Sequence, residues 1–104
     1  MNEWRLPTLH ELFSVFDHEQ GKPKVDGFIS DVYWSSTTHA YHNDSAWIVC
    51  FSYGGTAYNT KSKTYHIRCV REGHNKELEW AKTSSKKMTW YEACEYCKGM
   101  NNEK

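Results

Sequence analysis

Residues 46–55 have the sequence AWIVCFSYGG, and this stretch decides the fold class. Its apolar and aromatic side chains predict a strand over residues 46–53. One face of that strand carries Trp47, Val49 and Phe51, and the other carries Ile48 and Cys50. The two glycines that close the stretch are typical of a hairpin turn. We therefore predict a return strand over residues 56–59.

Two capping boxes predict one helix on each side of this hairpin. Thr8 is followed three residues later by Glu11, and Thr89 by Glu92. In such a box the Thr side chain accepts from the Glu amide while the Glu side chain reaches back. After the first box, apolar residues recur at helical spacing, at Leu9, Leu12, Phe13 and Phe16. One face of the second helix carries Trp90, Ala93 and Cys97, and Lys98-Gly99 supplies a stop.

Shorter segments complete the pattern. Further strands are expected over residues 32–36, 63–70 and 78–80. Polar loops are expected over residues 17–30, 37–45, 71–76 and 82–87. The fold class is therefore predicted to be α+β, with two short helices flanking a small, twisted, mainly antiparallel sheet with long loops.

Length and composition exclude several classes of function. The chain has 104 residues, which suits one domain with a modest core. Thirteen Lys and Arg residues balance thirteen Asp and Glu residues, so no nucleic acid partner is expected. No apolar run approaches the roughly 20 residues of a membrane span, so no membrane insertion is expected. Residues 1–8 lack the apolar core of a secretory signal, so no signal peptide is expected.

Four motifs carry a resemblance to a known family. Residues 4–8 are WRLPT and are followed by Glu11-Leu12, residues 33–37 are YWSST, residues 46–54 fit AWxVxFxxG, and residues 68–71 are RCVR. In this order they resemble the Lcl C-terminal domain family, a bacterial family long catalogued as a domain of unknown function. The resemblance implies a C-type-lectin-like fold, similar to that of formylglycine-generating enzymes, in which two helices flank a twisted antiparallel sheet.

The remaining motifs resemble the same family in a rotated order. Residues 78–80 (LEW) resemble its opening strand and residues 88–97 (MTWYEACEYC) its first helix, yet here both follow RCVR. Three interpretations stay open: a circular permutant, a fragment cut out of phase from a tandem array, and a chain that exchanges its C-terminal helix with a neighbour. We favour a single domain over residues 1–104, built from residues 1–71 and 77–104.

The resemblance also implies a disulfide between Cys69 and Cys97, because lectin-like folds tie the first helix to the last strand with a similar pair. The alternative is two reduced, buried thiols. Cys50 and Cys94 are candidates for a second bridge. Cys94 and Cys97 also form a C-x-x-C pair, which is a redox site or half of a zinc site in other proteins. Its position in the last turns of a helix disfavours a redox role, since the dipole there does not lower a thiol pKa.

The polar loop over residues 37–45 and the neighbouring hairpin form the expected ligand face. Tyr and Asn side chains near Ser and Thr suit an adaptable binding surface, and a merely hydrated loop is the simpler alternative. The residues expected to contact a ligand are Thr38, His39, Tyr41, His42, Asn43, Asp44, Tyr53 and Tyr58. No metal or cofactor is expected, because one Asn-Asp pair supplies too few oxygens for calcium.

No enzymatic activity is expected, because the sequence contains no nucleophile elbow, phosphate loop or HExxH motif. The favoured function is a non-catalytic lectin-like binding or structural module, with a protein or glycan ligand. The resemblance suggests that the parent is a bacterial surface or exported protein, extracellular or in the cell envelope. The alternatives are an oligomerisation module, dimeric through exchange of its C-terminal helix, and a thiol or metal site at Cys94 and Cys97.

Overall fold

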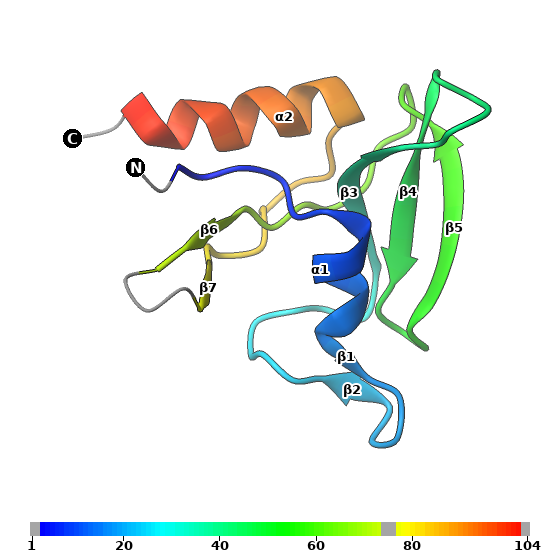
Figure 1. Ribbon diagram of the computed structural model, residues 1–104, viewed down its shortest axis with the longest axis vertical. Coiled ribbons are helices and arrows are strands. Elements are labelled where there is room, and N and C mark those ends of the chain that lie inside the picture. The colour runs from blue at the N-terminus through cyan, green and yellow to red at the C-terminus, as the bar shows by residue number, and fades with distance from the viewer. Residues whose placement is uncertain (1–2, 74–76, 103–104) are drawn as a thin grey trace.

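The computed structural model describes residues 3–73 and 77–102. Its elements, in chain order, are α1 (Leu9–Ser14), β1 (Phe16–Asp17), β2 (Lys22–Pro23), β3 (Val32–Thr38), β4 (Ser45–Cys50), β5 (Gly55–Thr60), β6 (Val70–Glu72), β7 (Leu78–Trp80), α2 (Trp90–Gly99) and the 3-10 helix η1 (Met100–Asn102) (Figure 1). The prediction of an α+β fold with two helices and small antiparallel sheets is confirmed.

A three-stranded antiparallel sheet in the order β3-β4-β5 forms the centre of the fold. β4 pairs with β5 in a regular register that sets Trp47 opposite Tyr58. The predicted hairpin is confirmed, but β4 ends at Cys50 rather than at residue 53, and the turn is residues 51–54 rather than the glycine pair. In its turn Gly54 has a φ of 82°, and a Cβ atom there would lie 2.4 Å from the Phe16 ring. Only glycine fits this position, for both reasons. Two smaller hairpins, β1-β2 and β6-β7, lie outside this sheet.

Two hydrophobic cores cover the two faces of the central sheet. The core between the sheet and α2 contains Leu6, Trp34, Ala46, Ile48, Ile67, Cys69, Ala93 and Cys97. The core beside α1 contains Leu12, Val15, Phe16, Tyr33, Val49 and Phe51. β4 therefore lies between two packed layers, and its alternate residues serve each in turn. This position explains why its sequence carries no charged side chain.

Both predicted capping boxes form. The Thr8 hydroxyl accepts from the Glu11 N–H at 3.2 Å, and the Glu11 carboxylate accepts from the Thr8 N–H at 2.9 Å. The box of Thr89 and Glu92 has the same two distances. In addition, the Arg5 guanidinium donates to both oxygens of the Glu11 carboxylate at 2.8 Å. The WRLPT motif thus fixes the start of α1.

The predicted end of α1 is wrong, whereas that of α2 is confirmed. α1 stops before Phe16, which lies in β1, because the Val15 carbonyl accepts from the Lys24 N–H and the chain turns into the β1-β2 hairpin. Phe13, expected in the apolar stripe, is 39% exposed. α2 ends at Gly99, although this glycine has no positive φ and the chain continues as η1.

The predicted strand over residues 63–70 is mostly wrong, since only Val70 lies in a strand, β6. The preceding residues run extended and make isolated bridges on both sides. Ser84 takes the place of a strand partner for Ile67: the Ile67 N–H donates to the Ser84 hydroxyl at 3.1 Å, and the Ile67 carbonyl accepts from the Ser84 N–H at 2.9 Å. Ser84 is buried for this reason, which corrects the prediction that residues 82–87 are a wholly solvated loop.

Arg68, the first residue of the RCVR motif, is buried and joins three segments. Its guanidinium donates to the Ala81 carbonyl and, at 2.8 Å, to the Asp26 carbonyl, and it lies 4.5 Å from the centre of the Phe28 ring. Burial lowers the pKa of Arg68 because desolvation disfavours the charged form. The side chain is thus a structural cation held by carbonyl groups and an aromatic face.

The remaining element boundaries differ by a few residues. β3 continues to Thr38, so the loop predicted over residues 37–45 is confined to residues 39–44. The loop predicted over residues 17–30 contains the β1-β2 hairpin, in which Asp17 pairs with Lys22. The link predicted over residues 71–76 begins inside β6, and its residues 74–76 lie outside the described residues.

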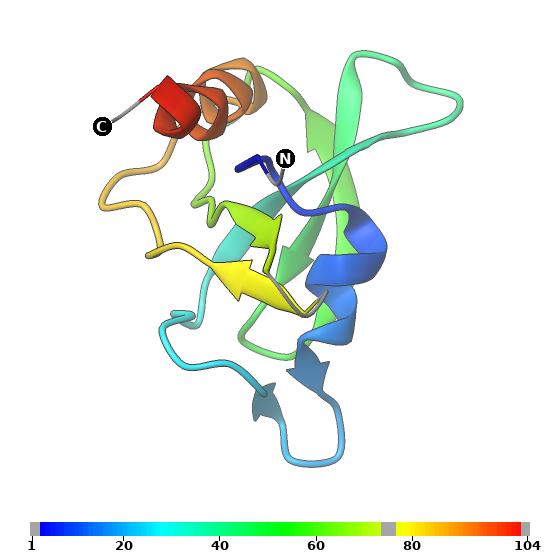
Figure 2. The same ribbon diagram turned by 60° about the vertical axis from the view of Figure 1, so that its left-hand side comes forward.

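Cys69 and Cys97 form a disulfide across 28 residues, as the resemblance implied. The bond joins the segment before β6 to the last turns of α2. Cys50 and Cys94 are free thiols, so the second bridge is not formed. At the same end of α2, the Asn101 side chain accepts from the Trp4 N–H at 2.7 Å and donates to the Trp4 carbonyl at 3.1 Å. The N-terminal segment consequently runs beside α2 (Figures 1 and 2).

Replacement of Cys69 and Cys97 together by Ser should lower the free energy of unfolding by about 3 kcal/mol, because the unfolded chain regains the entropy of a closed loop. Urea unfolding followed by tryptophan fluorescence measures the difference. Cys50→Ser is the matched control, since its thiol is free and half-buried, and should change little. A double variant as stable as the parent would contradict a formed bridge.

Replacement of Glu11 by Gln should remove a pH-dependent part of the stability. The Arg5 hydrogen bonds hold the pKa of Glu11 below its ordinary value of 4.5. A lowered native pKa stabilises the fold above the unfolded value and loses that contribution as the pH falls through the native value. Glu11→Gln should therefore be less stable than the parent at neutral pH and equal to it in strong acid. Urea midpoints across this range, with exposed Glu19→Gln as control, decide the point.

Candidate functional site

Four aromatic rings gather at the end of the central sheet where β4 begins, and we call His39, His42, Trp47 and Tyr58 the aromatic patch. His39 stacks on Trp47 at 5.1 Å between ring centres, with an angle of 23° between planes. His42 stacks on Tyr58 at 5.6 Å and 14°. His39 also lies 4.1 Å from Tyr58. The rings therefore form one continuous cluster at the surface.

The sheet register and the loop together build this patch. Trp47 and Tyr58 are cross-strand partners, so they lie on the same face of the sheet. The loop over residues 39–44 returns to the same place because the His39 N–H donates to the Ser45 carbonyl at 2.9 Å and the Ser45 N–H donates to the His42 carbonyl at 2.8 Å. These two bonds set both imidazoles over the strand pair.

The structure brings together most of the residues predicted to bind a ligand. Thr38 ends β3 opposite Ala46, and His39, His42 and Tyr58 form the patch. Tyr41 is 89% exposed beside it, with its ring 6.2 Å from His39. Asn43 and Asp44 are exposed at the tip of the same loop.

Tyr53 is the one predicted ligand residue that lies elsewhere. It sits in the turn between β4 and β5, and the Tyr53 and Gly54 N–H groups both donate to the Cys50 carbonyl. That turn is at the opposite end of the strand pair from the patch. Trp47 was not among the predicted ligand residues; it lies in the AWxVxFxxG motif, whose tryptophan was expected in the core. A two-residue turn at Gly54-Gly55 would have set Trp47 opposite residue 62, whereas the observed turn is residues 51–54 and sets it opposite Tyr58.

Lys61 connects the loop of the patch to α2. The residue is 8% exposed, and its ammonium donates to the Asn43 carbonyl at 3.0 Å and lies 4.1 Å from the centre of the Trp90 ring. Its backbone N–H donates to the Asp44 carbonyl, and its carbonyl accepts from the Trp90 N–H. A buried ammonium held by a carbonyl and an aromatic face fixes the loop in place.

The cysteines of the C-x-x-C pair are separated by the fold. Cys97 is bonded to Cys69, so it does not act with Cys94 as a redox or metal-binding pair. Burial raises the pKa of the Cys94 thiol, the direction expected for an unreactive cysteine. Among residues 3–73 and 77–102, no group of three His, Cys, Asp or Glu side chains is placed to hold a metal ion.

A family model, the Lcl C-terminal domain, matches residues 1–71. The chain belongs to the Lcl C-terminal domain family. The match ends within β6, so β7 and α2 lie beyond it. No curated protein and no solved structure matches the chain. The family assignment therefore gives no ligand for this chain, because neither comparison supplies a relative with a known ligand.

In this Lcl C-terminal domain the signature residues are structural. Trp4 lies under the Arg71 guanidinium, at 4.4 Å. The Trp34 indole N–H donates to the Met88 carbonyl at 3.0 Å, and the Ser35 hydroxyl donates to the Trp47 carbonyl at 2.8 Å. By contrast, the loop that supplies both histidines of the patch lies outside the motifs. The family motifs thus supply much of the scaffold and one ring of the patch, Trp47, whereas both histidines come from outside them.

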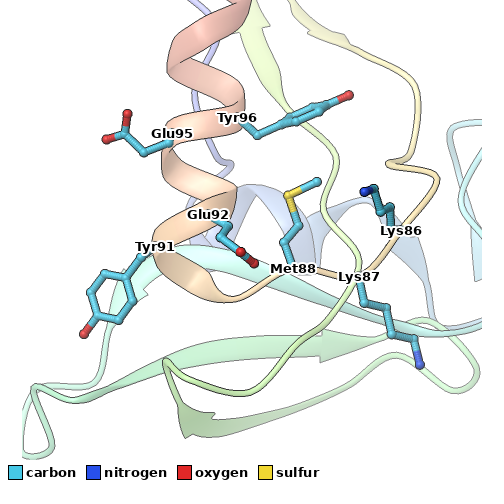
Figure 3. Close-up of a pocket in the computed structure, with 7 residues that line it drawn as sticks. All are labelled: Lys86, Lys87, Met88, Tyr91, Glu92, Glu95 and Tyr96. Carbon is cyan, nitrogen blue, oxygen red and sulfur yellow. The ribbon is translucent and has the colours of Figure 1, made fainter.

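A concave surface lies along α2, away from the aromatic patch, and was not predicted. We call it the α2 groove; it has a volume of about 660 Å³ and is lined by Lys86, Lys87, Met88, Tyr91, Glu92, Glu95 and Tyr96. Figure 3 shows Met88, Lys86 and Tyr96 on one side of the helix and Tyr91 and Glu95 on the other. Tyr91 and Tyr96 are 58% and 46% exposed.

No helix in the described part of the chain is long and apolar enough to cross a membrane.

Replacement of Lys61 by Met should loosen the patch loop without unfolding the domain. Met keeps the apolar packing and removes the cost of burying an ammonium, so the free energy of unfolding should change by less than about 1 kcal/mol. The loop loses its bond to Asn43, so hydrogen exchange at the His39 and Ser45 amides should accelerate about tenfold or more. Lys63→Met, at an exposed position, is the control. Unchanged exchange would show that Lys61 does not hold the loop.

Proposed function

We propose that this domain is a non-catalytic binding module and that its ligand is a glycan held on the aromatic patch. The observation that carries the proposal is the continuous cluster of His39, His42, Trp47 and Tyr58 rings at the surface. Tyr58 is 46% exposed and Tyr41 beside it 89%. Aromatic rings that stay exposed at one place mark a binding surface more often than isolated ones do.

The chemistry of the patch fits a sugar ring. A pyranose presents C–H groups on its faces, which pack on aromatic rings, and hydroxyl groups at its edge, which need polar partners. Here the rings supply the platform. The exposed Asn43 and Asp44 side chains stand at its border, where they can exchange hydrogen bonds with hydroxyl groups. The loop is held by Lys61 before any ligand arrives, which lowers the entropic cost of binding.

A non-catalytic role is part of the proposal. The conspicuous ionisable residues of the motifs are engaged in the scaffold: Glu11 and Glu92 cap helices, and Arg68 holds carbonyl groups. Burial raises the pKa of the Cys94 thiol, which disfavours the reactive thiolate. These engagements favour binding over catalysis as the role of the domain.

We further propose a C-type-lectin-like arrangement in an exported or surface-associated bacterial protein. Two helices on a small antiparallel sheet, with a disulfide between α2 and the RCVR segment, support the lectin-like comparison. The disulfide supports an oxidising compartment, because such bonds persist outside the bacterial cytoplasm.

A glycan array probed with the labelled domain tests the proposal, followed by titration of any bound sugar. Tyr58→Ala and His42→Ala should each weaken binding about tenfold or more, because each removes one ring of the platform. Tyr53→Ala is the matched control: this tyrosine is 67% exposed but lies at the other end of the sheet, so its loss should leave binding unchanged.

Two results would contradict the proposal. The first is a sugar that binds equally well to Tyr58→Ala and His42→Ala, which would move the site off the patch. The second is an array without any bound glycan, which would favour the protein ligand that the sequence left open. In that case the same three variants, tested by cross-linking to a surface extract, show whether the patch is still the contact.

A further inference from the structure

β5 forms an open edge of the central sheet. In the strand order β3-β4-β5 it has one neighbour, and it is the outermost strand of the sheet in Figure 1. The opposite edge is occupied, because the His66 N–H donates to the Val32 carbonyl at 3.1 Å and the Trp34 N–H donates to the His66 carbonyl at 3.0 Å. The outer side of β5 is therefore where this sheet can accept a further strand.

The main-chain groups of Thr56 and Tyr58 point away from β4. The Lys61 N–H donates to the Asp44 carbonyl, and the antiparallel register continues without a break along β5. Because alternate residue pairs of an antiparallel ladder exchange hydrogen bonds, Ala57 bonds to β4, whereas the residues on either side of it face outward. Within residues 3–73 and 77–102, the outward N–H and carbonyl groups of Thr56 and Tyr58 have no hydrogen-bond partner.

Thr60, the third outward-facing residue of β5, is satisfied by its own chain. Its N–H donates to the Asn59 side chain at 2.8 Å, and its carbonyl accepts from the Lys63 N–H at 3.0 Å. The open part of the edge thus consists of the two N–H and two carbonyl groups of Thr56 and Tyr58. Groups spaced in this way match the backbone of another extended strand.

Residues 55–60 lack the features by which edge strands usually avoid pairing with other chains. Their sequence, GTAYNT, contains no charged residue and no proline, and the pairing of β4 with β5 contains no bulge. The side chains of Thr56, Ala57 and Tyr58 are all exposed. Neither charge nor backbone shape therefore keeps a second strand away from this edge.

A second copy of β5 satisfies all four open groups. When two β5 strands pair antiparallel about a two-fold axis at Ala57, Thr56 of each copy lies opposite Tyr58 of the other, and each such pair exchanges two hydrogen bonds. The two alanines then face each other where paired strands approach most closely, and their small side chains fit there. A β-branched residue opposite an aromatic one is a favourable cross-strand pair. The formal net charge of zero means that two copies do not repel each other at long range.

From these observations we infer that the β5 edge is a homodimer interface, in which two three-stranded sheets join into one continuous antiparallel sheet. The two-fold axis is perpendicular to the sheet, so both aromatic patches lie on the same side of the dimer. The inference does not depend on the proposed function, because the pairing uses main-chain groups and needs no ligand. It also differs from helix exchange, because α2 stays bonded to its own chain through Cys69 and Cys97.

Sedimentation velocity from micromolar to millimolar concentration tests the inference. The parent domain should show a reversible dimer. Ala57→Lys should weaken association about tenfold or more, because it sets two like charges opposite each other on the axis. Ala57→Ser is the matched control and should leave the dimer intact, since its side chain is small and uncharged. Both variants keep the main-chain bonds to β4 at an exposed position, and urea unfolding confirms that each remains folded.

A cysteine on the axis tests the register itself. In a background of Cys50→Ser and Cys94→Ser, Ala57→Cys should form a disulfide-linked dimer under mild oxidation. The two Cα atoms of such a pair lie about 4.5 Å apart, a distance that a disulfide spans. Thr56→Cys is the control, because residue 56 of one copy faces Tyr58 of the other and lies more than about 7 Å from its own counterpart. It should cross-link far less.

Three results would overturn the inference. A parent that stays monomeric at millimolar concentration removes the interface. A dimer that is unaffected by Ala57→Lys lies elsewhere on the molecule. Cross-linking of Thr56→Cys as complete as that of Ala57→Cys excludes the pairing centred on Ala57.

Discussion

The Cys69–Cys97 disulfide is the constraint on which the rest of the structure depends. The family model matches the chain only to Arg71, and α2 lies beyond that match. Yet α2 supplies Ala93 and Cys97 to the core under β4, so the sheet has a covered second face only while this helix is in place. The disulfide holds its last turns, and the hydrogen bonds between Asn101 and Trp4 hold the segment after it. The C-terminal helix is thus fastened to its own sheet.

The features that were predictable from the sequence are those set by local chemistry. A Thr with a Glu three residues later satisfies the first N–H groups of a helix wherever it occurs, so both helix starts were correct. Gly54 in the turn after β4 revealed the hairpin, because few residues other than glycine accept a positive φ. The end of α1 and the strand over residues 63–70 were wrong because distant partners decide them: the Lys24 N–H bonds to the Val15 carbonyl, and Ser84 pairs with Ile67.

The predictions for the candidate site divide in the same way, because composition identified loop residues but not their positions along the sheet. His39, His42 and Tyr58 were selected from loop composition, and the structure sets them in one cluster. Tyr53 was selected for the same reason but lies at the far end of the hairpin, since composition does not say which end of a strand pair a residue occupies. Trp47 was expected in the core because it belongs to the AWxVxFxxG motif of the family. Its face is covered by α1 only near Val49, and the uncovered end leaves Trp47 to stack on His39.

Membership of the Lcl C-terminal domain family therefore informs about the scaffold and not about the ligand. Residues of the signature motifs have structural roles in this chain. Arg5 clamps the Glu11 cap, Trp34 and Ser35 donate to distant carbonyls, and Arg68 donates to the Asp26 and Ala81 carbonyls of two separate segments. Residues with such duties are hard to replace, because each loss leaves a buried polar group without a partner. The loop over residues 39–44 carries no such duty for its side chains, and its backbone is held by Lys61 from below. The two histidines of that loop are thus left to form the aromatic patch, in which they stack on Trp47 and Tyr58.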